Sequence, residues 1–196
     1  MSRCLRLRLG AEGYDHPGWA GSFYPEDLPR EWWAGYYAAL FPAVLLPARM
    51  LDDPTLETCL AEFSPQGRVF LRAPEPALLS GSHRERLIVL AQGFPAVLAG
   101  VLAVSPAQAQ GLRAQLGESI QVLGDTQAPV WRPDADAAHA GLGLLPTPPD
   151  LRTLRRWLDS FTSASESTDC TLILEGNPPS LGGLEQGRTL LEVMGW

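Results

Sequence analysis

The chain has 196 residues, of which 45% are hydrophobic and 19% charged, a composition typical of a globular domain rather than a disordered one. All 15 residues in the Lys+Arg count are arginine, which excludes a lysine Schiff base and the lysine of a phosphate-binding P-loop. The formal net charge of −7 at pH 7 argues against a nucleic-acid partner. We expect residues 1–196 to form a single domain.

The cysteine positions and the first residues of the chain are used to predict metal binding and cellular location. Cys4, Cys59 and Cys170 lie far apart, and no Cys or His spacing typical of a metal site occurs. No metal is therefore predicted, and no cofactor can be named. The first residues lack the apolar core of a signal peptide, so we expect a cytoplasmic protein.

Taken in chain order, Leu5, Leu7 and Leu9 alternate with Arg6 and Arg8, as in a half-buried or edge strand. Further short apolar segments predict strands at 44–46, 68–72, 96–102, 120–123 and 171–174. Three- and four-residue spacing and Pro or Asp start signals predict helices near 29–41, 55–63, 83–90, 106–116, 151–161 and 184–194.

Two other segments are expected to be irregular. Residues 126–149 hold five prolines and little periodicity, which favours a long loop. Residues 160–168 are polar and are interpreted as a linker. His83 and His139 have no ligand spacing to another histidine, so we expect both on the surface.

The stretch from Leu87 to Leu112 carries no charge and is long enough for a membrane helix. However, Gln92 and Pro95 interrupt it near its start. We interpret it as the end of a helix, a turn and a strand buried on both faces, as in parallel sheets, and expect no membrane partner.

The order of strand and helix alternates about six times, which indicates a parallel sheet with helices packed outside it. A complete eight-fold barrel usually needs about 250 residues. We therefore predict an α/β, TIM-barrel-like fold, an incomplete barrel of about six to seven strands; a doubly wound open sheet is the alternative. Unpaired edges of such a barrel would favour a homo-oligomer that covers them.

The first 41 residues carry a specific pattern of aromatic and glycine residues. Its parts are Leu9-Gly10, Gly13-Tyr14, Trp19-Ala20-Gly21-Ser22-Phe23-Tyr24-Pro25, Trp32-Trp33, Tyr36-Tyr37 and Phe41. This frame resembles the N-terminal signature of the YecE-like family (domain of unknown function seventy-two). A weaker match covers Val69 to Pro74. The resemblance implies a TIM-barrel-like fold and no established activity.

Departures from that family pattern fall at strand ends, where a barrel places its chemistry. The resemblance implies a Glu and an Asn after the second strand, where this chain has Leu45 and Pro47. The family Lys before Ala-Pro is replaced by Arg72, and the middle of the chain is expected to be shortened. Leu45 can neither titrate nor hydrogen-bond, so the chain resembles a shortened and divergent relative.

Ionisable residues remain at the predicted strand ends. Asp15, His16, Asp125 and Glu175 are candidate catalytic residues, because carboxylates near an imidazole can perform acid/base chemistry. The alternative is an exposed polar loop for Asp15 and His16, and a routine turn residue for Asp125.

Ligand-binding candidates surround the same expected mouth. Arg72 can hold an anion with its planar guanidinium or pair with Glu12 or Glu75. Trp19 and Tyr24 of the signature loop, with Glu12 and Asn177, complete the predicted ligand-binding set. Small anionic molecules are therefore possible ligands.

Two functions fit these features. The first is a degenerate barrel, of unknown function, that binds a ligand or partner without the family's usual site. The alternative is a metal- or acid/base-assisted hydrolase or lyase acting on a phosphorylated or sugar-like small molecule. The alternative requires the catalytic candidates to converge at one mouth.

Overall fold

The computed structural model describes residues 4–133, 138–148 and 150–196. In these residues seven parallel strands form one sheet and six α-helices pack outside it. The strands are β1 (Arg6–Glu12), β2 (Ala43–Leu46), β3 (Arg68–Arg72), β4 (Leu98–Leu102), β5 (Val122–Leu123), β6 (Leu142–Leu145) and β7 (Asp169–Leu174). The helices are α1 (Trp33–Leu40), α2 (Leu56–Glu62), α3 (Gly81–Gly93), α4 (Pro106–Leu116), α5 (Leu151–Ala164) and α6 (Leu181–Met194).

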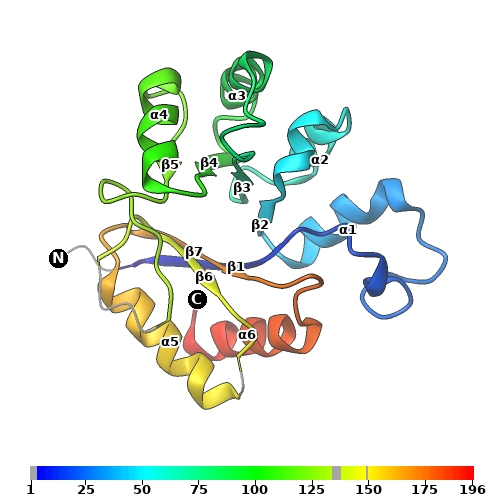
Figure 1. The fold of residues 1–196 in the computed structure, drawn as a ribbon. Helices are drawn as coiled ribbons and strands as arrows, with labels where there is room; N and C mark the ends of the chain where they lie inside the picture. Colours follow the sequence, from blue (N-terminus) through cyan, green and yellow to red (C-terminus); the bar gives the residue numbers. More distant parts are fainter. Residues whose placement is uncertain (1–3, 134–137, 149) are drawn as a thin grey trace.

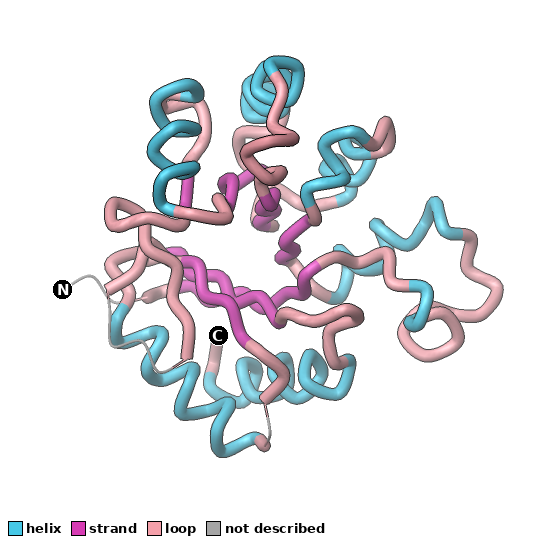
Figure 2. Tube along the Cα trace, viewed as in Figure 1, coloured by secondary structure: helices cyan, strands magenta, loops and turns pink. Residues whose placement is uncertain are grey.

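The sheet has the strand order β5-β4-β3-β2-β1-β7-β6 and curls into a half-barrel with the helices outside (Figures 1 and 2). This is the neighbour order of a TIM barrel opened between β5 and β6. The predicted incomplete α/β barrel of six to seven strands is therefore confirmed. No helix in the described part of the chain is long and apolar enough to cross a membrane.

The strand β6 was missed by sequence analysis, which predicted a loop over 126–149. Its four residues are buried and pair with β7. Five prolines around this short apolar run concealed it, because a four-residue buried strand has no periodicity of its own. The expected polar linker is also wrong at its start, since α5 continues to Ala164.

The open edge of β6 is partly covered by the chain itself. The backbone N–H of Trp131 donates to the Leu142 carbonyl, and the N–H of Leu144 donates to the Trp131 carbonyl, both at 2.9 Å. Trp131 thus forms an isolated parallel bridge with Gly143. An edge with paired backbone groups is less open to another chain.

Alternation along the strands divides the apolar core into two layers. Side chains such as Leu7, Leu9 and Val44 face the helices and form the larger layer. Those facing the barrel interior are the second layer: Ala43, Leu45, Phe70, Leu102, Leu123, Ala128, Leu142, Leu144 and Ile173. The barrel is therefore filled rather than hollow at its centre.

The strand β1 lies between β2 and β7, so it is not an edge strand. Its Arg8 points away from the helix-facing side occupied by Leu7 and Leu9, and its side chain is only 4% exposed. Gly10 lies on the same inner face. A Cβ there would approach the Ala43 carbonyl oxygen to 1.9 Å, so glycine is needed where β1 meets β2.

His139 is also buried, contrary to the surface position expected from sequence. Its ring stacks on Phe161 at 4.3 Å between centroids, and Nε2–H donates to the Phe161 carbonyl at 2.8 Å. Nδ1 accepts from the Gly141 N–H at 3.1 Å. Burial lowers the pKa of this neutral imidazole, whose two nitrogens are both used. His83 lies half-buried at the start of α3 and contacts Asp52.

Candidate functional site

The carboxyl ends of β1, β3 and β7 bring three predicted residues together. Glu12 is the last residue of β1, Arg72 the last of β3, and Glu175 directly follows β7. Nη2 of Arg72 donates to Oε1 of Glu12 at 2.6 Å and lies 3.5 Å from Oε1 of Glu175. One guanidinium therefore sits between two carboxylates, and its expected alternative of pairing with Glu12 is observed.

Arg132 joins this group and was missed by sequence analysis. It binds Glu175 with both terminal nitrogens, at 2.6 Å and 3.2 Å. It lies in the proline-rich segment between β5 and β6, where no periodicity pointed toward the site. The resulting four-residue network alternates in sign and carries no net charge.

One hollow beside this network measures about 510 Å³ and has an apolar floor. Arg72 and Arg132 line it together with Leu102, Val130 and Leu144. A pocket that joins an apolar floor to two planar cationic groups suits a small anion with an apolar part.

Asp125 also lines this hollow but is engaged elsewhere. Its carboxylate binds Arg113 at 2.5 Å and 3.0 Å and accepts from the backbone N–H groups of Gln127 and Ala128. The Arg113 contact is the main reason that the pKa of Asp125 falls to about 2, helped by the two backbone bonds. The Asp125 side chain is therefore ionised and stabilises the turn that follows β5.

A second hollow of about 420 Å³ contains other predicted residues. Glu12, Asp15, His16 and Asn177 line it with Arg49. Nη2 of Arg49 holds both oxygens of Asp15, at 2.8 Å and 2.9 Å. Nε2–H of His16 donates to the Glu12 carbonyl at 2.8 Å. Of the four catalytic candidates, Asp15 and His16 thus line one hollow and Asp125 lines the other.

Trp19 and Tyr24 lie in the core rather than in either hollow. Each is 1% exposed, and Tyr24 stacks on Trp33 at 4.3 Å between ring centroids. The Tyr24 hydroxyl donates to the Tyr14 carbonyl at 2.6 Å. The aromatic signature therefore fixes the loop after β1 by packing.

Leu45 is fully buried in the barrel interior and is the register partner of Glu12 on the neighbouring strand β1. Pro47 lines the second hollow. Within the described residues, no group of three or more His, Cys, Asp or Glu side chains could hold a metal ion.

Fold and site together define a class: an incomplete TIM-barrel-like protein with a balanced arginine–carboxylate network at its carboxyl-end mouth. Two solved structures share the fold. A DUF72 family protein from Thermotoga maritima aligns with a TM-score of 0.53 and 14% identity, covering 95% of this chain and 99% of that one. A DUF72 family protein from Enterococcus faecalis aligns with a TM-score of 0.59 and 11% identity, covering 97% and 96%.

These comparisons confirm the resemblance to the YecE-like family (domain of unknown function seventy-two) at the level of fold. No family model and no curated protein matches the sequence. Neither alignment tests the expected shortening of the middle, which stays a prediction. The descriptions of the two structures name a family and no activity.

Proposed function

We propose that the carboxyl-end mouth binds a small anionic molecule with an apolar part and performs no acid/base chemistry on it. The main observation behind this proposal is that Arg72 and Arg132 both line the carboxyl-end hollow of about 510 Å³. Both are partly exposed, at 27% and 54% of the side chain. Both can therefore meet a ligand without unfolding the site.

The carboxylates orient these arginines. Glu12 holds Arg72, and Glu175 holds Arg132 through two hydrogen bonds. Among the described residues lining the hollow, Asp125 is the one carboxylate, and Arg113 already neutralises it. In the lining of the hollow, the anionic group of a ligand would thus meet guanidinium groups rather than an unpaired carboxylate of the same sign.

The alternative of a hydrolase or lyase has less support. It needs Asp15 and His16 to act with Asp125 and Glu175, and these side chains line separate hollows or are held by arginine. Leu45 supplies no polar group at the strand end where the family pattern has a carboxylate. What remains for acid/base work is His16, which lies beside Glu12 and Asp15.

Phenyl phosphate tests both functions in one assay, because it joins an oxyanion to an apolar ring and can also be hydrolysed. Isothermal titration should show binding, weakened about tenfold in Arg72→Gln and Arg132→Gln, since each loses a charged hydrogen-bond donor. The control Arg155→Gln removes a 65% exposed arginine of α5 and should bind as the parent does.

Release of phenol distinguishes the alternative. Turnover that disappears in His16→Asn would overturn the binding-only proposal and favour the hydrolase. Equal binding by Arg72→Gln, Arg132→Gln and the parent would overturn this choice of site.

Two further features of the proposal concern the protein's surroundings. We infer a reducing, cytoplasmic location, supported by three free cysteines that are all buried. We also propose that the chain forms a homo-oligomer through the β5 edge, because Trp131 covers part of the β6 edge. Light scattering of the purified chain tests that proposal, and a strict monomer at high concentration would contradict it.

A further inference from the structure

The opposite end of the barrel, at the amino ends of the strands, holds another hollow of about 510 Å³. Its polar walls include Arg68, Gln121, Ser167 and Asp169. Its apolar lining comes from four strands: Phe70 of β3, Leu98 of β4, Leu123 of β5 and Leu142 of β6. The hollow therefore spans the amino-end opening of the half-barrel.

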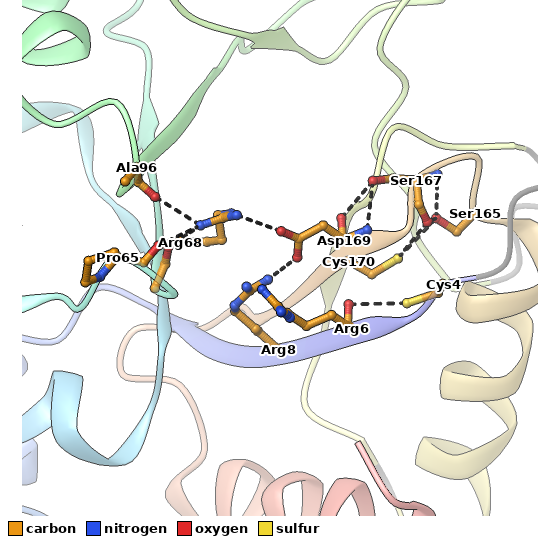
Figure 3. Close-up of polar contacts among 11 residues, drawn as sticks. Cys4, Arg6, Arg8, Pro65, Arg68, Ala96, Ser165, Ser167, Asp169 and Cys170 are labelled. Atoms are coloured by element: carbon orange, nitrogen blue, oxygen red, sulfur yellow. Dashed lines mark hydrogen bonds and ion pairs between the residues drawn. The ribbon is translucent and has the colours of Figure 1, made fainter.

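Two arginines hold the Asp169 carboxylate at the edge of this hollow. Arg8 of β1 donates to Oδ1 of Asp169, and Nη2 of Arg68 donates to Oδ2 at 2.7 Å (Figure 3). Two arginines thus share one carboxylate. Arg6, two residues before Arg8 on β1, lies on the same side of the strand.

Arg8, the most buried of these arginines, lacks a hydrogen-bond partner in the described part of the chain for one of its donor groups. Arg8 is 4% exposed, and its Nη2 is buried with no hydrogen-bond partner among the described residues. Burial lowers the pKa of Arg8, and the charges of Arg68 and Arg6 act in the same direction. An unpartnered buried donor on a charged group is costly, so an added anion would stabilise this end of the barrel.

We infer that the amino-end hollow binds a small oxyanion: Arg68 on its lining holds the ligand, Arg8 and Arg6 add positive charge nearby, and Asp169 competes with the ligand. Arginine suits this role because its planar donors match the oxygens of phosphate or carboxylate groups. Arg6 is exposed and Arg68 is 25% exposed, so both are reachable from solvent. Glu118 on the lining disfavours large anions of high charge.

The apolar interior separates this hollow from the mouth of the proposed function. Leu102 and Leu144 line the carboxyl-end hollow, whereas Phe70 and Leu142 line this one. All four belong to the same filled interior layer. Variants at one end should therefore leave binding at the other unchanged.

Inorganic phosphate is the probe, titrated by calorimetry and by thermal unfolding at constant ionic strength, with acetate as a second arm. Phosphate should bind the parent and raise its unfolding temperature. Arg6→Gln and Arg68→Gln should each weaken binding about tenfold, because each removes a charged donor. Asp169→Asn should tighten binding about tenfold, because it removes the competing carboxylate.

The matched control is Arg155→Gln, a surface arginine outside both hollows, which should bind phosphate as the parent does. Arg6 is exposed on its strand, so Arg6→Gln keeps the test valid even if Arg68→Gln unfolds. Tighter binding of acetate than of phosphate would assign a carboxylate ligand to the same site. Absence of phosphate and acetate binding, or binding that Arg6→Gln leaves unchanged, would overturn the inference.

Discussion

The charged groups at the two ends of the barrel differ in how completely the arginines are paired with carboxylates. At the carboxyl end, Arg72 and Arg132 alternate with Glu12 and Glu175, so the network is balanced and partly exposed. At the amino end, two arginines, Arg8 and Arg68, share the single carboxylate of Asp169, and Arg8 is almost entirely buried. Where positive and negative charges balance, an arginine can leave its carboxylate and bind a ligand. Where positive charge is in excess and buried, an added anion stabilises the fold.

The apolar layer between these ends makes them independent. Leu45, Phe70, Leu102 and Leu144 fill the barrel, and each is 5% exposed or less. Each end can therefore be tested separately. The largest loss in the free energy of unfolding is expected for a change in the apolar layer that divides them.

Leu45→Glu places a carboxylate where the family pattern has one. We expect it to cost more than about 4 kcal/mol in the free energy of unfolding, because the position is fully buried among apolar side chains. Urea denaturation measures the loss. Leu45→Met, the volume-conserving control, should cost under about 1.5 kcal/mol. A stable Leu45→Glu variant would show that solvent reaches this depth and that the two ends are not sealed from each other.

Asp169→Asn tests the unbalanced end. It leaves Arg8 buried without its counter-charge, so we expect a loss of about 3 kcal/mol in phosphate-free urea denaturation at pH 7. Burial acts to raise the pKa of Asp169, but the hydrogen bonds and charges of Arg8 and Arg68 lower it below the usual value. The contribution of the carboxylate is therefore present above about pH 4 and is lost as pH falls below that.

The difference between the parent and Asp169→Asn should accordingly shrink toward pH 3. Asp159→Asn, which removes a 58% exposed carboxylate of α5, is the control and should change stability by less than about 0.5 kcal/mol. If the two variants behave alike at pH 7, Asp169 does not balance a buried charge.

Sequence patterns predicted the barrel because its strands are buried on both faces and alternate with helices. They also gave Glu12 or Glu75 as the alternative partner of Arg72, and the structure shows Glu12, which ends a parallel strand at the same edge. They missed Arg132, because its place follows from a bridge between Trp131 and Gly143 rather than from any local pattern. Nothing in a segment with five prolines points to that pairing.

The amino-end hollow was missed for a different reason. Alternating leucine and arginine in the first strand suggested a half-buried or edge strand, since charged residues are seldom fully buried. Asp169, more than 160 residues away, pairs with Arg8 and makes burial possible. Barrels place their chemistry at the carboxyl ends of strands, so the candidate residues predicted from sequence all belong to the other end.

Asp125 provides the smallest test, because it distinguishes a structural carboxylate from a functional one at the balanced end. Its pKa of about 2 lies below the value of about 4 expected in the unfolded chain, so it stabilises the fold by about 2 kcal/mol at neutral pH. That stability is present above about pH 4 and is lost as pH falls toward 2. Asp125→Asn should lose this amount in urea denaturation at pH 7 and show a weaker pH dependence below pH 4.

The matched change is Arg113→Gln, which removes the partner, and the double variant should lose less than the sum of the two single losses because the pair acts as a unit. Phenyl phosphate binding, measured while the variants are folded, should stay within about twofold of the parent value. A tenfold loss of binding in Asp125→Asn with unchanged stability would instead make Asp125 part of the ligand site, and the carboxyl-end mouth would then bind through a carboxylate as well as through its arginines.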